Sequence, residues 1–214
     1  GKKAVAVFEA KTPKTKKEFV KTLKRLFKKL ARKDIQIKSI GIGVPGVVEK
    51  NKVVFCPNIP YLKNFDFRGV FPELSLKIDN DARAFLRGEL NFGAGGGAKK
   101  ALIFTIGTGI GRAFAERGKV KIIKKFEYPE KWEKEYQRAR DSRDDGALAA
   151  VLAEQLSAIV EKHKPDIVII GGGILKRKNF FSRLKKKLRE KNKKIKFKKA
   201  ILGDSAGAIG AALL

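Results

Sequence analysis

The sequence has no methionine, one cysteine, one histidine and no long hydrophobic run. The single thiol, Cys56, excludes a framework of internal disulfide bonds and a zinc site built from cysteines, so we expect a protein of the reducing cytoplasm. Because a membrane-spanning helix needs about 20 apolar residues, we expect no membrane span. The first residues, GKKAVAVFEAKTP, contain no signal-peptide core, and without an initiator methionine we expect the native start to lie elsewhere than Gly1.

Negative charge is scarce. The sequence contains 22 Asp and Glu residues and 50 Lys and Arg residues, which gives a net charge of +28. Such a field attracts nucleic acids, anionic lipids or anionic metabolites. The densest basic stretch is KRKNFFSRLKKKLREKNKKIKFKK, residues 176–199. We favour a solvated, lysine-rich surface, and nonspecific attraction to nucleic acids is the other interpretation.

Hydrophobic periodicity predicts alternating strands and helices, which is typical of an α/β fold. The predicted strands cover residues 4–9, 35–44, 74–78, 101–106, 112–117, 120–123, 166–170 and 194–200, with a hairpin in VVEKNKVVF at 47–55. The predicted helices cover residues 15–31, 79–90, 129–140, 145–163, 179–191 and the closing segment DSAGAIGAALL at 204–214. The glycine-rich segment 92–100 predicts a hinge-like linker. We therefore expect two lobes, 1–94 and 95–203, with the closing helix 204–214 completing the first.

Three glycines and a threonine interrupt two strand-like runs in FTIGTGIGR, residues 104–112. A dinucleotide fingerprint or a P-loop requires a helix next, and a P-loop also requires Gly-Lys-Ser/Thr, which is absent here. The motif suits a β-hairpin in which Gly107, Gly109 and Gly111 let backbone N–H groups approach phosphate oxygens, with the Thr108 hydroxyl as another donor. A plain tight turn is the alternative, and from these residues alone neither is preferred.

Two further segments follow predicted strands. The glycines Gly171, Gly172 and Gly173 end a buried strand, and they would let a flat ligand such as adenine lie against the backbone. A loop that only closes the sheet is the simpler interpretation. Asp81 follows Ile78-Asp79-Asn80 at a strand end, where open α/β sheets bind ligands, and a helix N-terminus would keep its carboxylate ionised to accept a proton. Ordinary helix capping by these short polar residues is the simpler explanation there.

The loop Pro57-Asn58-Ile59-Pro60 is stiffened by its two prolines, which would hold the Asn58 carboxamide rigidly. A structural turn is an equally good interpretation. Neither this loop nor any single motif above identifies a family by itself. The order of these motifs along the chain is far more specific than any one of them.

That order resembles the ROK family of sugar kinases and related repressors. The matching segments are GIGVPGVVEKNKVVFCPNIPYL, IDNDARAFLRGEL, ALIFTIGTGIGRAFAERGKV, VIIGGGIL and GDSAGAIGAALL. The resemblance implies the two-lobed, actin-like ATPase fold (ribonuclease H-like), with mixed sheets flanked by helices and a nucleotide between the lobes. It implies ATP and Mg²⁺ as cofactors and in-line phosphoryl transfer, with Asp81 as the general base. Sugar hydroxyls would be bound by Asn80, Asn58 and Gly46; Gly107–Gly111 would be the second phosphate loop, and Gly171–Gly173 would border the adenosine.

The sequence departs from the family in three places. The Asp-x-Gly-Gly-Thr loop that starts the family's first lobe is absent, so we expect either a further N-terminal segment or a partner to supply it. The Glu-x-Gly-His sugar motif is replaced by VKIIKKFEYPEKWEKEY, in which Glu127 is the candidate carboxylate. The Cys/His zinc cluster is also absent, so we expect no structural zinc.

Three functions are therefore compared. The leading hypothesis is an ATP-dependent kinase of a sugar or sugar-like compound, which would have a small-molecule partner and could be a homodimer, as relatives often are. The alternative is a catalytically impaired sugar- or nucleotide-sensing protein, favoured by the missing phosphate loop and sugar motif. The third is a nucleic-acid-binding protein, favoured only by the charge, because the sequence contains no helix-turn-helix segment ahead of the core.

Overall fold

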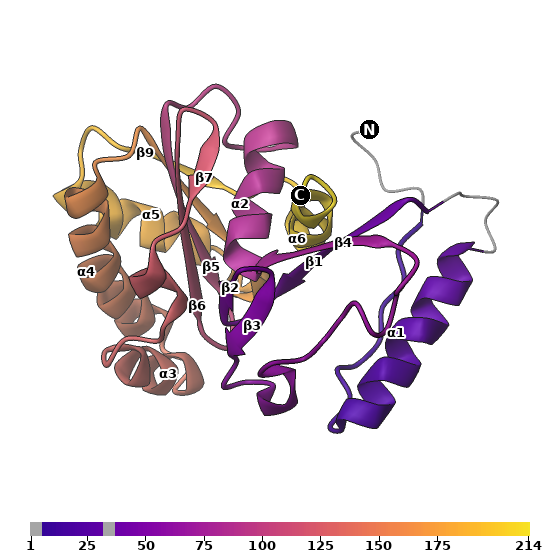
Figure 1. The fold of residues 1–214 in the computed structure, drawn as a ribbon. Coiled ribbons are helices and arrows are strands. Elements are labelled where there is room, and N and C mark those ends of the chain that lie inside the picture. The colour runs from indigo at the N-terminus through magenta and orange to yellow at the C-terminus, as the bar shows by residue number, and fades with distance from the viewer. Residues whose placement is uncertain (1–5, 32–36) are drawn as a thin grey trace.

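The structure, a computed structural model, describes residues 6–31 and 37–214 (Figure 1). The predicted α/β fold is confirmed: helices pack on a mixed five-stranded sheet in one lobe and on two strand pairs in the other. One predicted strand is wrong, since residues 6–9 lie in no strand, and the remainder of that segment lies outside the described residues. A short apolar run is not enough for a strand, because a strand also needs a neighbour to accept its hydrogen bonds.

The larger sheet has five strands in the order β7-β6-β5-β8-β9. These strands are β5 (Lys100–Ile106), β6 (Ile110–Glu116), β7 (Lys119–Lys121), β8 (Ile167–Gly171) and β9 (Lys196–Lys199). β5, β8 and β9 run parallel, whereas β6 and β7 run antiparallel to their neighbours. Because β5 turns directly back into β6, the FTIGTGIGR segment is a hairpin, as its sequence predicts.

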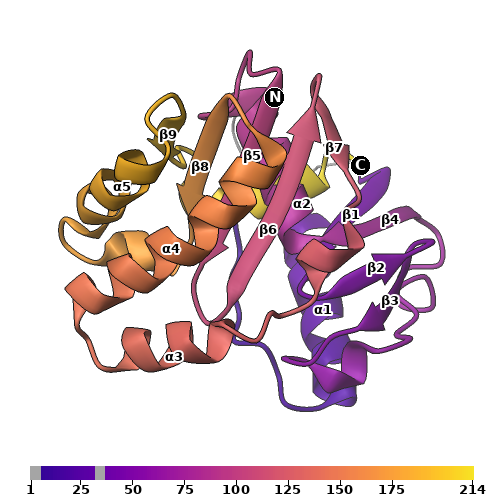
Figure 2. The same cartoon turned by 90° about the vertical axis from the view of Figure 1, so that its left-hand side faces the viewer.

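Helices α4 (Asp145–His163) and α5 (Phe180–Lys191) cover one face of this sheet (Figure 2). The Asp144 carboxylate caps α4 by accepting hydrogen bonds from the Gly146 and Ala147 amides. Both helices bury a stripe of leucines, one every turn, against the sheet: Leu148, Leu152, Leu156, Leu184 and Leu188. The predicted charged helix is shorter than expected, and α3 covers Glu133–Asp141.

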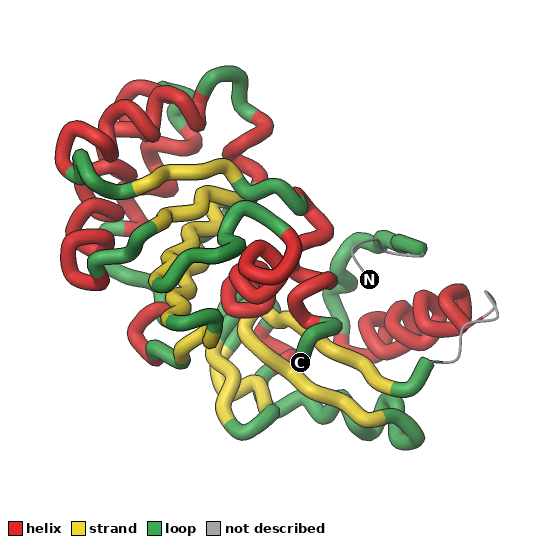
Figure 3. Tube along the Cα trace, turned by 90° about the horizontal axis from the view of Figure 1, so that it is seen from above, coloured by secondary structure: helices red, strands yellow, loops and turns green. Residues whose placement is uncertain are grey.

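The smaller lobe contains two strand pairs and one outer helix. β1 (Ser39–Val44) pairs in parallel with β4 (Ser75–Asn80), and β2 (Val47–Glu49) forms a hairpin with β3 (Lys52–Phe55). Helix α1 (Lys16–Ala31) packs its apolar side, including Phe19 and Leu23, on this lobe. Seen from above, these elements lie beside the larger sheet and its helices (Figure 3).

Helix α2 (Asp81–Phe92) connects the two lobes, because it packs on β5 and β6 of the larger sheet and on β1 and β4 of the smaller one. Helix α6 (Ala206–Ala211) crosses α2 and also contacts β1. A Cβ atom at Gly210 would lie 1.7 Å from the Ala84 carbonyl oxygen, and one at Gly88 would lie 2.5 Å from the Ala206 carbonyl oxygen. The glycines at positions 88 and 210 are therefore explained by the close approach of two helix backbones.

The glycine-rich segment predicted as a hinge-like linker consists of turns between α2 and β5, and its first part, Ala94 and Gly95, is buried. Glu89, fully buried in α2, accepts hydrogen bonds from the Ala94 amide at 2.7 Å and from the Ile201 and Leu202 amides at 3.0 and 2.8 Å. A buried carboxylate that satisfies three backbone donors fixes the chain around it. The end of α2 is thereby tied to the segment that follows β9.

Within residues 6–31 and 37–214, no helix combines enough length with enough apolar character to cross a membrane.

Candidate functional site

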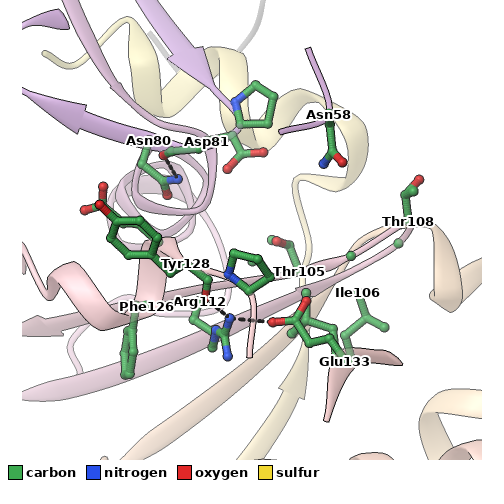
Figure 4. A pocket seen from close by; sticks show the side chains of 18 of the residues that line it. Asn58, Asn80, Asp81, Thr105, Ile106, Thr108, Arg112, Phe126, Tyr128 and Glu133 are labelled. Carbon is green, nitrogen blue, oxygen red and sulfur yellow. Dashed lines mark hydrogen bonds and ion pairs between the residues drawn. The ribbon is translucent and has the colours of Figure 1, made fainter. Parts of the chain in front are cut away.

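A cavity of about 520 Å³ lies where the N-terminal end of α2, the turn between β1 and β2, the loop that follows β3 and the β5–β6 loop meet (Figure 4). It brings together most of the residues that the sequence singles out, from segments far apart in the chain. These residues are Gly46, Asn58, Asn80, Asp81, Gly107, Thr108, Gly109, Gly111, Glu127 and Gly172. Gly171 and Gly173 are not part of its lining.

Asn80 caps helix α2. Its Oδ1 accepts hydrogen bonds from the Ala82 amide at 3.0 Å and the Arg83 amide at 3.1 Å, and its Nδ2 donates to the Gly46 carbonyl at 2.9 Å. Gly46 has a φ of +117°, and a Cβ there would lie 2.1 Å from the Phe55 carbonyl oxygen, so only glycine fits. Capping by Asn80 therefore also fixes the turn between β1 and β2 at the cavity wall.

Asp81 is the first residue of α2, and its side chain opens into the cavity (Figure 4). Its Oδ1 accepts a hydrogen bond from the Ala82 amide at 2.8 Å. Solvent reaches the carboxylate through the cavity, but the surrounding protein atoms desolvate it and raise the pKa of Asp81 to about 6, against the opposing effect of the backbone amides. Asp81 is therefore largely ionised at neutral pH with a pKa close to that of an efficient general base.

The loop between β5 and β6 offers free backbone donors to the cavity. Within the described parts of the chain, the Thr108 and Gly109 amides donate to no acceptor. No described atom lies within 4 Å of a Cβ built at Gly107, and only the Glu133 carboxylate, at 3.8 Å, approaches one at Gly109. Neither glycine is demanded by the fold, so the space that their side chains would fill remains open for a ligand.

The other glycines have structural reasons. A Cβ at Gly111 would lie 2.2 Å from Thr105 Oγ1, and a Cβ at Gly171 would lie 2.8 Å from the ring of Phe85 on α2. Gly172 has a φ of +91° and faces the backbone of Ile106. Tight packing accounts for these three positions, whereas at Gly173 no described atom lies within 4 Å of a built Cβ.

Glu127 lies in a short 3-10 helix (Lys124–Glu127), and its side chain is 2% exposed. One carboxylate oxygen pairs with Arg83 of α2, and the other accepts a hydrogen bond from the Val48 amide at 3.1 Å. Arg83 also pairs with Asp79, whose second oxygen lies 2.7 Å from Arg87 Nη2. Glu127 thus connects the larger lobe, helix α2 and the β2–β3 hairpin.

Several residues of the cavity wall and of helix α3 beside it do not follow from the motifs. Arg112 is buried and pairs with Glu130 at 2.7 Å and with Glu133 at 2.6 Å, while Tyr136 and Arg140 of α3 contact the β5–β6 loop. One signal for the α3 residues is present in the sequence. Glu133, Tyr136 and Arg140 recur at intervals of three and four residues, which places them on one face of the predicted helix.

Ligation of a metal by protein side chains alone has little support. In the described ranges, no three His, Cys, Asp or Glu side chains gather as a metal site. Mg²⁺ that accompanies a nucleotide takes its ligands chiefly from phosphates, water and one or two carboxylates. The open loop with free amides fits a nucleotide phosphate. Asp81 and Glu133 are carboxylates of the cavity wall that could supply a ligand to the accompanying ion.

Comparison with known proteins identifies the family. The sequence model of the ROK family matches residues 2–123 and 130–214. A glucokinase from Thermotoga maritima is 37% identical over 84 residues, which is 37% of this chain and 26% of the glucokinase. A xylose repressor from Caldicellulosiruptor bescii is 33% identical over 105 residues, which is 45% of this chain and 26% of the repressor. Both matches thus span about a quarter of the relative's own length.

The fold also occurs among solved structures. A ROK family glucokinase from Streptomyces griseus, crystallised with glucose and AMPPNP, superposes with a TM-score of 0.81 at 20% identity, covering 99% of this chain and 91% of that one. This likeness shows the fold. It does not by itself identify a substrate.

Proposed function

This chain belongs to the ROK family, and from that premise we propose that it is a sugar kinase that transfers the γ-phosphoryl group of ATP to a hydroxyl of a sugar or sugar-like compound. The observation that carries the proposal is one cavity shared by an ionisable carboxylate, Asp81, and two backbone amides, those of Thr108 and Gly109, that have no acceptor among the described residues. A base for the acceptor and donors for the phosphate are the two elements that in-line phosphoryl transfer requires.

Asp81 acts as the general base in this proposal. It takes the proton of the acceptor hydroxyl as that oxygen bonds to the γ-phosphorus and the bond to the ADP leaving group breaks. The start of α2 favours the ionised form, but desolvation outweighs it, and the raised pKa makes the carboxylate a better proton acceptor than an aspartate with an ordinary pKa.

The β5–β6 loop binds the phosphates of the donor. The Thr108 and Gly109 amides and the Thr108 hydroxyl donate to phosphate oxygens, where fixed donors stabilise developing charge. Mg²⁺, when bound, would neutralise part of the negative charge of the phosphates. Gly172 and Gly173 border the nucleotide on the other side, and Gly171 supports them by packing on α2.

Sugar hydroxyls are held by Asn58, by Asn80 and by the Gly46 turn that Asn80 fixes. Both oxygens of Glu127 already have protein partners, but a carboxylate has about four acceptor sites, so Glu127 can still accept a sugar hydroxyl. We propose that its first role is to connect the lobes 1–94 and 95–203, with segment 204–214 returning to the first lobe through α6. The cytoplasmic location, the homodimer and weak attraction to nucleic acids stay predictions.

A sugar- or nucleotide-responsive binding protein is the second candidate function. One reason is that the Glu127 carboxylate already pairs with Arg83 and accepts a hydrogen bond from the Val48 amide. The other is the similarity to a xylose repressor. Such a protein would bind the same ligands in the same cavity without turnover.

The test is ADP release from Mg²⁺-ATP in the presence of single hexoses, pentoses and N-acetylhexosamines, with acceptor-free ATP hydrolysis as the control. We expect steady ADP production with at least one sugar and formation of the corresponding sugar phosphate, detected by mass spectrometry. Sugar binding with no product in any reaction would favour the responsive binding protein over the kinase.

The pH dependence follows from Asp81. The base works in its ionised form, so kcat/KM should be constant above about pH 7 and fall below about pH 6, approaching tenfold per pH unit, as Asp81 becomes protonated. The measurement is initial rates between pH 4.5 and 8, with circular dichroism at each pH to confirm that the protein stays folded. A rate that holds constant to pH 4.5 would mean that Asp81 is not the titrating base.

A further inference from the structure

Two carbonyl oxygens of the β5–β6 loop are held by helix α3. The Gly107 carbonyl accepts hydrogen bonds from Tyr136 Oη at 2.5 Å and from Arg140 Nη1 at 3.3 Å. The Thr108 carbonyl accepts one from Arg140 Nη1 at 2.6 Å. The third carbonyl of the turn, that of Gly109, accepts from the Gly107 amide at 3.0 Å. Three successive carbonyl groups thus have partners inside the protein.

These contacts also set the direction of the two free amides. In a trans peptide unit, the C=O of one residue and the N–H of the next lie in one plane and point in opposite directions. The Gly107 carbonyl shares its peptide with the Thr108 amide, and the Thr108 carbonyl shares its peptide with the Gly109 amide. Holding both carbonyls toward α3 therefore turns both N–H groups away from α3.

The donors on α3 are themselves firmly placed. Tyr136 is fully buried, so its hydroxyl needs an internal partner, and the Arg140 guanidinium lies 5.8 Å from the centre of the Tyr136 ring. Arg177 donates to the Arg140 carbonyl at 2.8 Å and pairs with Asp145 of α4 at 2.7 Å. Helix α3 is thereby anchored to the segment that follows Gly171–Gly173 and to the start of α4.

We propose that Tyr136 and Arg140 are positioning residues for the donor phosphates: they keep the Gly107 and Thr108 peptides oriented so that the Thr108 and Gly109 amides face the phosphates. A rotated peptide would present a carbonyl oxygen to an anion, which reverses an attraction into a repulsion. The inference rests on the proposed function, because it assumes that the anion is the phosphate chain of a nucleotide. In this proposal the two side chains raise the affinity for the nucleotide and do not contact the sugar.

The experiment measures binding of Mg²⁺-AMPPNP and of adenosine by isothermal titration calorimetry to the unmodified protein, Tyr136→Phe and Arg140→Gln. We expect AMPPNP to bind about tenfold more weakly to each variant, the size of one lost hydrogen bond, and adenosine, which lacks phosphates, to bind with unchanged affinity. Arg140→Lys keeps one donor and should recover part of the loss. The matched control is Arg138→Gln, which removes the same charge from an exposed position of α3 and should leave both affinities unchanged.

The outcomes separate the two proposals. If the unmodified protein binds no AMPPNP, the kinase proposal fails and this inference fails with it. If it binds AMPPNP but both variants retain its affinity, the inference alone is overturned. An equal weakening of AMPPNP and adenosine, or a loss in Arg138→Gln as large as in Arg140→Gln, also overturns it, because α3 would then support the whole site or act through bulk charge.

Discussion

Replacing Asp81 with Asn is expected to lower the rate of sugar phosphorylation by about two to four orders of magnitude, the usual contribution of a general base. Asparagine has nearly the same shape and can still accept the hydrogen bond from the Ala82 amide, but it cannot take up a proton. Binding of sugar and nucleotide should be largely retained, so the loss should appear in kcat. The measurement is steady-state kinetics with the sugar that the unmodified protein phosphorylates.

The control for this substitution is Asp204→Asn. Asp204 is exposed and pairs only with the exposed Lys176 among the described residues, so its loss should change neither kcat nor stability appreciably. Because the raised pKa of Asp81 means that the folded protein disfavours the ionised carboxylate, loss of this charge should not lower the free energy of unfolding. Turnover by the Asp81→Asn variant at the unmodified rate would remove Asp81 from the mechanism.

Replacing Gly210 with Ala is expected to lower the free energy of unfolding by about 3 kcal/mol, because overpacking that moves backbone is among the costlier core changes. The added Cβ would lie 1.7 Å from the Ala84 carbonyl oxygen and 2.7 Å from the Gly88 amide nitrogen, so α6 must move away from α2. A cost of this size is a large part of the 5–15 kcal/mol that stabilises an ordinary protein. Urea unfolding followed by circular dichroism measures it.

The matched control lies on the same helix. No described atom lies within 4 Å of a Cβ at Gly207, so Gly207→Ala should stabilise the protein by about 0.5–1 kcal/mol through helix propensity alone. Equal effects of the two substitutions would show that the α2–α6 crossing adapts without cost. That result would contradict the close backbone approach as the reason for glycine at position 210.

Elements with a strong local signal are predicted well. Helix α4 has the predicted bounds, Asp145–His163, because its capping aspartate and its leucines one turn apart are both properties of neighbouring residues. The β2–β3 hairpin is confirmed for the same reason, since Lys50-Asn51 in VVEKNKVVF is a turn between two apolar runs. The segment 92–100 misleads because its composition indicates flexibility, whereas its turns are held by Glu89, a residue outside the segment.

The candidate site also contains residues that the sequence could predict and others that it could not. The sequence identifies Asp81 and the Gly107–Gly111 loop, because the order of motifs along the chain is characteristic of the family. It could not show that Asn80 rather than Asp79 or Asp81 provides the cap, or that Gly171 serves packing. The choice of cap depends on the direction in which the side chains point. The packing of Gly171 depends on Phe85, which lies 86 positions before it in the chain.

The sequence by itself determined the α/β class, the hairpin at FTIGTGIGR and the family, because periodicity, turn chemistry and motif order are written locally along the chain. Only the tertiary structure decided which backbone amides stay free for a ligand, how Glu127 is engaged, and that Tyr136 and Arg140 contact the loop. Each of these depends on atoms of residues about 30 to 80 positions apart, as with Arg140 and Thr108 or Glu127 and Val48. No local pattern specifies such a contact, since it forms only when the packed helices and sheets bring the two residues within hydrogen-bonding distance.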